Sequence, residues 1–463
     1  MIVAKLLAAT IIQPKQDGDF SPNDTSFSNL LFVAVAMVLL TRSSLDLISE
    51  ANKFSIGSAD IGIGAPINAL MIGVSFLLIL ANYKILPLRD FVAWFAFLAL
   101  CIFGSVETTQ PINVARSVLA LLSSLCVFII PFCLIKGTRD VRRLIDLILL
   151  SSLIPTCVGL LQIIANLGDG DFRLQSTFSH PNIFAFYIVV VMAALMFKWS
   201  SVHFTPNHFR RFAYIFYFGV LGVLLIYTKT RTAWFGAGVL FTVFALFIDR
   251  RAIPLLFVIP FLALLEPGVR DRLLDVASET EYIGDGVIIN SLEWRKVLWR
   301  SAFVWIEERP FFGHGGLNSF LQYSPRFFSL EERGVPAHSV YVRLLFEIGI
   351  LGLIFFVGIF VQALWRLSQM ARSDWNGVVI GITLCVSYLA FCFADNMLYY
   401  GPFNWYFLFF LGIVLAAGRV PVRRGAGLLR PRWQQQVPIP SPAYGRRRRV
   451  WAPSFLHSNE QLR

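Results

Sequence analysis

The sequence predicts an all-α, multi-pass membrane protein with about 12 transmembrane helices and one long outer loop, and three observations support this fold class. Of its 463 residues, 56% are hydrophobic and only 15% are charged, against about 25% charged residues in soluble globular proteins. The apolar residues form runs of roughly 20, the length that crosses a bilayer as a helix. The alternating pattern of a membrane β-barrel is absent, so helices are expected.

Twelve apolar runs define the expected spans. They cover residues 29–48, 66–86, 90–106, 112–135, 144–166, 181–199, 212–228, 232–248, 252–266, 338–365, 377–395 and 401–417. The first nine spans therefore lie within 29–266 and the last three within 338–417. An N-terminal segment, 1–28, precedes them, and a 71-residue loop, 267–337, separates the two groups.

The positions of lysine and arginine predict how the spans are oriented. With the N-terminus inside the cell, every inner connection holds at least two basic residues, whereas the short outer loops hold between none and two, as the positive-inside rule predicts. Both termini are then cytoplasmic, and loop 267–337 faces outward. The net charge of +12 comes mainly from the tail, 418–463, which contains ten arginines and one acidic residue.

This basic tail is interpreted as a topology signal that keeps the C-terminus inside. Binding to anionic lipid or to a partner protein is the alternative interpretation. Nucleic acid is not expected as a partner, because few aromatic residues are interleaved with the arginines around Arg446–Arg449 and the body of the chain is apolar.

The outer loop 267–337 is far longer than an ordinary connection, and long loops of this kind usually carry function. Within it, Ser291–Glu308 is expected to form a helix that ends at Arg309-Pro310 and is followed by a glycine-rich turn. One side of this helix is broadly apolar and suited to lying at a membrane interface. Its apolar residues are Trp294, Val297, Leu298, Trp299 and Ile306.

The six cysteines are predicted to be buried packing residues. All of them fall inside apolar runs, and they form neither a Cys-x-x-Cys motif nor a Cys/His cluster. The sequence therefore predicts neither a disulfide framework nor a zinc site.

Ionisable residues at the outer ends of the spans form the candidate site. Charged groups at or inside a span are costly, so they tend to be functional or paired. The positive set suits a diphosphate, because guanidinium groups bind phosphate oxygens in a fork. Its members are Arg173, Lys229, Arg231 and Arg343, with His180 beside them. No metal is expected, since cations and a base suffice for transfer from a lipid diphosphate.

His338, which opens the tenth span, is the candidate base. An unperturbed histidine has a pKa near 6.5, so a neutral His338 can accept a proton from a hydroxyl group. Secondary candidates are His314, Arg295, Glu347 and Asp395.

Each candidate also has a purely structural interpretation. Lys229 and Arg231 can extend to the lipid headgroups from helix ends. His180, before Pro181-Asn182, can mark only a turn and a helix start, and His314 can be an exposed loop residue. The carboxylates of Glu347 and Asp395 can pair with arginines instead of acting as acids.

Four ordered motifs carry a resemblance to a known family. They are Arg-x6-His-Pro-Asn (173–182), Thr-x-Thr-Arg-Thr-Ala (228–233), Pro-Phe-Phe-Gly-x-Gly (310–315), and His338-Ser-x-Tyr followed by Glu347-x-Gly and Gly352. Arg295 and Trp299 also fit the family's loop pattern. In this order, with many spans and a long loop, the chain resembles the O-antigen ligase and polysaccharide polymerase superfamily of bacterial envelopes over roughly residues 60–417.

The resemblance implies an inner-membrane enzyme without a cofactor that transfers glycan from an undecaprenyl-diphosphate donor at the periplasmic face. Arg173 and Arg231 would hold the diphosphate, and His338 would activate the acceptor hydroxyl. His314 stands where the family varies. The implied partners are the lipid-linked oligosaccharide, membrane lipids, a polysaccharide co-polymerase and a flippase.

Three alternatives to a polymerase remain. The basic tail and aromatic-rich body resemble exopolysaccharide-production polymerases, but the motifs do not separate these from ligases that use lipid A-core as acceptor. A transporter would need internal repeats and polar groups near the midplane, whereas here they gather at one face. A polyprenyl-monophosphate glycosyltransferase would have paired acids in the first outer loop, which offers only the separated Asp46, Glu50 and Asp60.

Overall fold

The computed structural model describes residues 22–420, except 52, 57–58, 63, 108–109, 167–171, 205–206, 265–269, 271–280, 284–286, 290, 329 and 331–332. The predicted N-terminal segment up to residue 21, parts of loop 267–337 and the basic tail beyond residue 420 therefore lie outside the described residues. The all-α fold class is confirmed, with two short antiparallel hairpins added to the helices.

The elements follow one another along the chain as α-helices, short 3₁₀ turns (η) and the four strands. They are α2 (Pro22–Arg42), α3 (Asp46–Ala51), β1 (Lys53–Ile56), β2 (Ala59–Gly62), α4 (Gly64–Asn82), η1 (Tyr83–Ile85), η2 (Leu88–Phe91), α5 (Val92–Gly104), η3 (Ser105–Glu107), α6 (Pro111–Leu134), α7 (Thr138–Ser151), α8 (Leu153–Ala165), α9 (Pro181–Ser200), α10 (His208–Tyr227), α11 (Arg231–Phe247), η4 (Arg250–Ala252), α12 (Leu255–Leu264), β3 (Glu281–Ile283), β4 (Val287–Ile289), α14 (Ser291–Glu308), α15 (Ser319–Phe327), α16 (Val340–Met370), α17 (Trp375–Ala394), η5 (Met397–Tyr399) and α18 (Gly401–Ala417).

The protein is a multi-pass membrane protein by the length and composition of its helices. Among the described residues, seven helical segments are long and apolar enough to cross a membrane, with α7 and α8 counted together. Three shorter apolar helices, Asn29–Arg42, Arg231–Phe247 and Gly401–Ala417, add to them. Each of the twelve predicted runs coincides with a helix or a helix pair, while twelve full spans stay a prediction.

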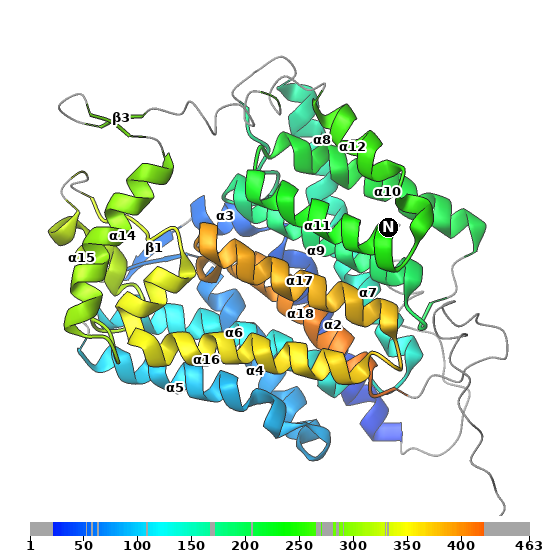
Figure 1. The fold of residues 1–463 in the computed structure, drawn as a ribbon. Coiled ribbons are helices and arrows are strands. Elements are labelled where there is room, and N and C mark those ends of the chain that lie inside the picture. The colour runs from blue at the N-terminus through cyan, green and yellow to red at the C-terminus, as the bar shows by residue number, and fades with distance from the viewer. Residues whose placement is uncertain are drawn as a thin grey trace, which may run out of the picture. The chain divides into compact units, whose positions relative to one another are not determined.

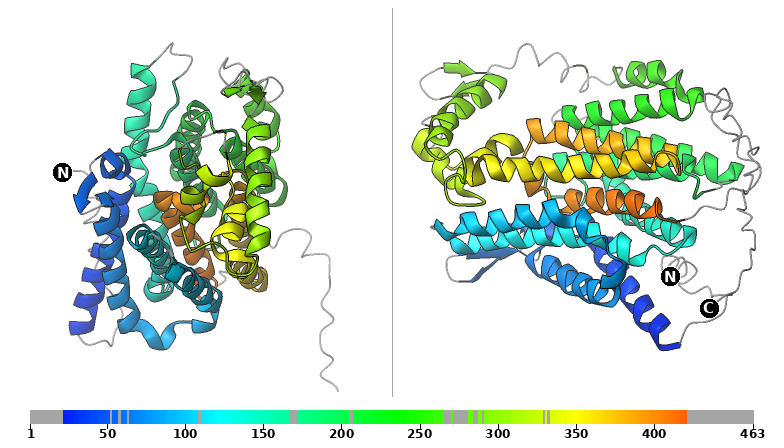
Figure 2. Two further views of the ribbon diagram at one scale, coloured as in Figure 1. Left: turned by 90° about the vertical axis from the view of Figure 1, so that its left-hand side faces the viewer. Right: turned by 60° about the horizontal axis from the view of Figure 1, so that its bottom comes forward.

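Helices α9 and α18 form the centre of the bundle. Every residue from Ile183 to Phe197 in α9 and from Pro402 to Ala417 in α18 is buried. A helix that is apolar all round is stable only when other helices cover it on all sides. Helix α18 packs against α6, α7, α9 and α17, and α16 lies beside α5 and α17 (Figures 1 and 2).

Pro155 explains why one predicted span is two helices, α7 and α8. A proline inside a helix lacks an N–H and clashes with the carbonyl four residues before it, which here belongs to Ser151. The Ser151 carbonyl accepts a hydrogen bond of 2.8 Å from the Ser43 hydroxyl on α2. The break therefore frees a carbonyl that fastens α2 to the bundle.

Gly349 produces a second interruption, inside α16. Its φ of +69° is non-helical, and the carbonyls of Phe346 and Glu347 are freed. They accept hydrogen bonds from the backbone N–H groups of His314 (2.8 Å) and Gly316 (3.1 Å). The glycine-rich turn of the outer loop is thus joined to α16 by backbone hydrogen bonds at the kink.

Helix α14 occupies the predicted residues 291–308, but the expectation that its apolar side lies on the membrane is wrong for most of that side. Leu298 and Ile306 are buried in a small core with Phe320 and Phe346, and Trp294 packs against it. The loop has its own hydrophobic partners because α15, which was not predicted, supplies them. Phe303 and Val304 on the opposite side of α14 are exposed.

The cysteine prediction is also wrong at one position. Cys157 on α8 is exposed, whereas the other five cysteines are buried. Position 157 lies near Ile154 and Leu161, which are also exposed on α8. An apolar run therefore contains lipid-facing as well as packed positions, and composition alone does not distinguish them.

We predict that Gly349→Ala destabilises the protein by at least about 1–3 kcal/mol, because a φ of +69° with a ψ of −170° lies in a region that essentially only glycine adopts. The added Cβ would also lie 2.3 Å from the backbone of Phe311. The matched control is Gly358→Ala on the same helix, where a Cβ meets nothing within 4 Å. Thermal unfolding in detergent should separate the two variants, and equal midpoints would contradict the kink.

Candidate functional site

The segment that carries Arg173 and His180 is fastened to the junction of α2 and α3. The Asp46 carboxylate accepts hydrogen bonds from the Ser179 backbone (3.1 Å) and hydroxyl (2.8 Å). Asp46 is itself almost buried and pairs with the buried Arg42 at 3.5 Å. Asp46 therefore holds the segment in place from α3, and it does so as a structural acid.

Asn182 joins residues from three loops into one polar group. Its Oδ1 accepts hydrogen bonds from Arg173 Nη2 (3.0 Å) and from the Thr230 hydroxyl (3.1 Å). Its Nδ2 donates to Asp395 Oδ2 at 2.7 Å. Arg173 Nε also donates to the Thr228 carbonyl at 3.3 Å. A cation from one segment and a carboxylate from another are thus held on opposite sides of one amide.

Asp395 extends this group towards His338. Its Oδ1 accepts hydrogen bonds from the Tyr400 hydroxyl (2.7 Å) and from the backbone N–H of Asn396 (2.8 Å). Asn396 Nδ2 lies 3.5 Å from Nδ1 of His338. The polar group therefore runs from Arg173 through Asn182 and Asp395 to the imidazole of His338.

The amide of Asn396 has two orientations, related by a half-turn that exchanges Oδ1 and Nδ2. With Nδ2 towards His338, Oδ1 is buried without a hydrogen-bond partner among the described residues. After the half-turn, Oδ1 accepts from the Nδ1–H of His338. In the second orientation the proton of His338 is on Nδ1, so Nε2 can accept a proton, while the amide nitrogen takes the buried position.

Helix α14 brings a third cation and two aromatic rings to His338. Trp294 packs edge-on against the imidazole, with ring centroids 5.7 Å apart. Arg295 Nη1 donates to the Ala394 carbonyl at 3.1 Å, and Trp299 Nε1 donates to the Ala337 carbonyl at 2.7 Å. The loop helix therefore packs against His338 and fixes the backbone immediately before His338 and immediately before Asp395.

The surroundings keep His338 neutral. Burial lowers the pKa of His338 below 6.5, Arg295 and His180 lower it further, and Asp395 opposes them. Partial burial and Arg173 likewise lower the pKa of His180, against the effect of Asp395. A neutral imidazole at pH 7 can act as a base, which is the role that the sequence predicted for His338.

Two residues of the site have left-handed backbone conformations. Lys229 has a φ of +51° and His338 a φ of +50°. Such conformations are uncommon for residues other than glycine, asparagine, aspartate and histidine, so the one at Lys229 is the more unusual of the two, and they concentrate at functional sites. Here they turn the chain between α10 and α11 and immediately before α16.

The remaining predicted residues lie beside this group or apart from it. Lys229 and Arg231 flank the buried Thr230, and Arg231 is the first residue of α11. Arg343 pairs with Glu347 in a separate buried pair at 2.9 Å, as the structural interpretation of Glu347 expected. His314 is buried, not exposed, and its Nε2 lies 2.6 Å from the Trp305 carbonyl while its ring stacks on Phe346.

The sequence did not assign roles to Asn182, Thr230, Asn396 and Tyr400, which connect the charged residues. The first two lie inside quoted motifs, so spacing offered a signal for them. Asn396 and Tyr400 flank η5, which follows Asp395, and nothing in their sequence separates them from other polar residues.

The described residues also line a cavity of about 360 Å³, bordered by Phe103, Arg309 and Phe312, that does not include the site residues.

These features define an α-helical multi-pass membrane protein with cations, a carboxylate and a neutral histidine joined at one end of the bundle. Comparison with protein families gives the more specific result. Residues 216–357 match the O-antigen ligase family model. The resemblance to the O-antigen ligase and polymerase superfamily is thereby confirmed over this segment, which contains Arg231, Arg295 and His338 but not Arg173 or Asp395. No curated protein sequence matches the chain.

We predict that His338 reacts with diethyl pyrocarbonate, which modifies neutral imidazoles, with a pH midpoint below 6.5. Reactivity should rise with pH, because burial and Arg295 lower the pKa of His338. Arg295→Gln should move the midpoint upward, and Asp395→Asn should move it downward. Mass spectrometry of the peptide that contains His338 measures the modification. Identical midpoints in all three proteins would contradict the arrangement.

Proposed function

We propose that the protein is a glycosyltransferase that polymerises undecaprenyl-diphosphate-linked oligosaccharide repeat units at the periplasmic face of the bacterial inner membrane. The observation that carries the proposal is the connected group of Arg173, Asn182, Asp395 and His338. The family match supports a ligase or polymerase type of function, and that family acts on lipid-linked glycans in membranes.

The chemistry needs a base, a cationic binding site and an activated leaving group. The neutral His338 accepts the proton of the acceptor hydroxyl at Nε2 as the hydroxyl oxygen forms a bond to the anomeric carbon. The bond from that carbon to the phosphate oxygen breaks, and undecaprenyl diphosphate leaves with the electron pair. Arg173 and Arg231 bind the diphosphate and stabilise the charge that develops on it. Direct displacement of this kind inverts the anomeric centre.

Asp395 takes no proton in this scheme. Its two oxygens already accept hydrogen bonds from Asn182, Tyr400 and Asn396. Its part is to favour the imidazolium that forms on His338 after proton transfer, as its effect on the pKa of His338 indicates.

The distribution of charge along the chain supports the proposed placement of the site at the periplasmic face. Arg173 and Thr230 lie in connections, and His338 and Asp395 at span ends, that the positive-inside rule assigns to the outer side. A second set of polar contacts joins predicted inner connections, including Arg142 to the His203 carbonyl (2.6 Å) and Ser201 to Asp374 (2.6 Å). This grouping supports the proposed topology, with a flippase and a co-polymerase as expected partners.

Ligation to lipid A-core is the second candidate function, and the family description favours it. An O-antigen ligase uses the same donor and leaving group and differs in the acceptor. The residues of the site bind the diphosphate and the acceptor hydroxyl in either case. The acceptor in the assay therefore decides between the two reactions.

We predict that His338→Ala, Arg173→Ala and Arg231→Ala each lower the rate of product formation by about 10²-fold or more. Removal of a general base or of an electrostatic donor typically has effects of this size. The assay contains purified protein and lipid-diphosphate-linked repeat units, with products resolved as a ladder on a gel. EDTA should leave the wild-type ladder unchanged.

Arg250→Ala, in a predicted inner connection, is the control and should retain wild-type rates. Near-normal amounts of long polymer from any of the three site variants would remove that residue from the proposed mechanism. A wild-type protein that consumes donor only when lipid A-core is added is a ligase. If no donor is consumed with either acceptor, the glycosyltransferase proposal fails and a transporter becomes the leading hypothesis.

A further inference from the structure

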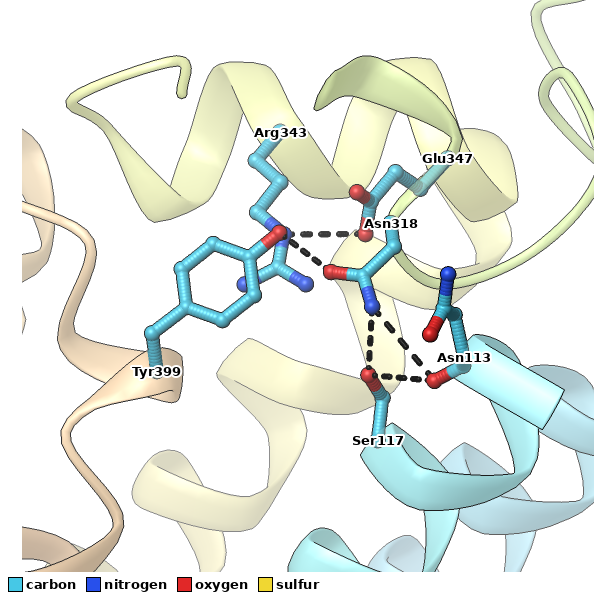
Figure 3. A network of polar contacts seen from close by, with 6 residues as sticks. All are labelled: Asn113, Ser117, Asn318, Arg343, Glu347 and Tyr399. Carbon is cyan, nitrogen blue, oxygen red and sulfur yellow. Dashed lines mark hydrogen bonds and ion pairs between the residues drawn. The ribbon is translucent and has the colours of Figure 1, made fainter. Parts of the chain in front are cut away.

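A second buried polar group lies beside η5 and is separate from the group that contains His338. Arg343 Nε donates to Glu347 Oε2 at 2.9 Å, and both residues are almost completely buried, at 2% and 0% exposed. The ring of Tyr399 covers the guanidinium of Arg343, which lies 3.4 Å from the ring centroid. The Tyr399 hydroxyl donates to Asn318 Oδ1 at 2.6 Å (Figure 3).

Asn318 connects this group to α6. Its Nδ2 donates to the Ser117 hydroxyl at 2.8 Å and to the Asn113 carbonyl at 3.4 Å (Figure 3). Asn318 has a left-handed φ of +72°, a conformation that asparagine tolerates better than most residues. The outer loop, α6, α16 and η5 therefore meet at one set of side chains.

The contacts of Tyr399 bear on the site because η5, which contains Tyr399, lies between site residues in the chain. The 3₁₀ turn Met397–Tyr399 lies between Asp395 and Asn396 on one side and Tyr400 on the other. Asn396 faces His338, at the start of α16, and Tyr399 faces Arg343, about one and a half turns further along α16. The segment is thus attached to α16 at two points, one at the reaction site and one outside it.

Burial of an ion pair costs free energy that its own attraction rarely recovers in full, so a pair of this kind is weak evidence for stability alone. Arg343 Nη1 and Glu347 Oε1 have no hydrogen-bond partner among the described residues, which adds to that cost. A cationic guanidinium attracts an aromatic face most strongly where water is excluded. Burial therefore strengthens the attachment of Tyr399 to Arg343.

We infer that Arg343, Glu347, Tyr399 and Asn318 form a clamp that fixes η5 and so positions Asp395, Asn396 and Tyr400 relative to His338. The inference rests on the proposed function, since these are positioning residues for that transfer. It reassigns Arg343, which the sequence placed among the diphosphate-binding residues, to a role in which it does not touch the substrate.

The test uses Tyr399→Phe, because this change removes only the hydroxyl and keeps the ring over Arg343. Loss of one hydrogen bond should lower turnover about threefold to tenfold and leave the KM for the lipid-linked donor unchanged. Ser117→Ala removes the bond from Asn318 to α6 and should act in the same direction. The double variant should lose less activity than the product of the two single losses, because both changes act on one network.

Two further measurements distinguish positioning from a general loss of stability. Hydrogen exchange of the peptide containing residues 395–400 should quicken in Tyr399→Phe, since its backbone amides are bonded within η5. The groups that face His338 are Arg295, His180 and Asp395, and Asp395 raises its pKa. If η5 carries Asp395 away, the rising limb of the pH–rate profile should move to lower pH.

Tyr217→Phe is the matched control. The Tyr217 hydroxyl is bonded to Ser152 (2.6 Å) and Thr156 (3.0 Å) between α8 and α10, so an equivalent contact is removed away from η5. This variant should retain wild-type turnover, pH profile and exchange at 395–400.

Each outcome decides the inference. Quicker exchange with a lower turnover and a shifted pH limb supports the clamp. Unchanged exchange, or quicker exchange with unchanged turnover, overturns it. If the wild-type protein forms no product with either acceptor, the proposed function fails instead, and the clamp is then judged by the exchange of residues 395–400 in Tyr399→Phe alone.

Discussion

The hydrogen bond between Asn182 and Asp395 is the contact on which the arrangement of the site depends. In the interior of a membrane protein, buried polar groups have only one another as partners, because lipid offers none and water is scarce. Asn182 supplies both an acceptor for Arg173 and a donor for Asp395, so one neutral side chain satisfies a cation and an anion. A charged residue at that position would satisfy only one of them. The amide thereby joins α9 to the connection between α17 and α18, which the sequence separates by more than two hundred residues.

Interruptions in the helices help to position the residues that make this contact. The bundle is held by α9 and α18, which are apolar on all sides and buried. Around them, Pro155 and Gly349 interrupt helices, and the backbone groups they release bind other segments instead of remaining unsatisfied. Ser151 binds α2, whose continuation holds the Arg173 segment through Asp46. Phe346 and Glu347 bind the glycine-rich turn, and that turn leads directly to Asn318. The interruptions therefore carry the connections between the bundle and the polar end of the molecule.

Much of the fold could be predicted from the sequence, because a membrane helix has a strong and local signal. Apolar runs predicted the membrane helices. The apolar side of residues 291–308 and the Arg309-Pro310 pair that follows them predicted α14. Three features were not accessible in this way. The split of α7 from α8 depends on one proline that many membrane helices tolerate. Helix α15 is short and polar outside its contacts with Phe346, so composition gives no sign of it. The inward face of α14 depends on partners that come from distant parts of the chain.

The candidate site shows the same division between charge and context. An ionisable residue in an apolar chain is conspicuous, because placing a charge near lipid costs free energy. This cost was enough to predict Arg173, His338 and Asp395 as candidates. Their connecting residues are neutral amides and hydroxyls, which are common in outer loops and acquire meaning only when the fold brings them together. For Arg343 the same reasoning allows two interpretations, since a charge near lipid can have a functional role or belong to a buried ion pair. The contact of Arg343 with Glu347 in the structure favours the ion pair.

Arg343 and Arg173 have different electrostatic surroundings, because they belong to two separate polar groups. If Arg343 faced the substrate, Glu347 would stay behind as an uncompensated buried carboxylate one helical turn away, which is strongly unfavourable. Arg173 is held differently: its guanidinium donates to the amide oxygen of Asn182, and the amide nitrogen donates to the carboxylate of Asp395. The amide of Asn182 thereby orients the guanidinium of Arg173, which the proposed function assigns to an anionic ligand. The protein therefore places Arg343 in a direct buried ion pair with Glu347, and an amide orients Arg173, the cation that is proposed to bind diphosphate.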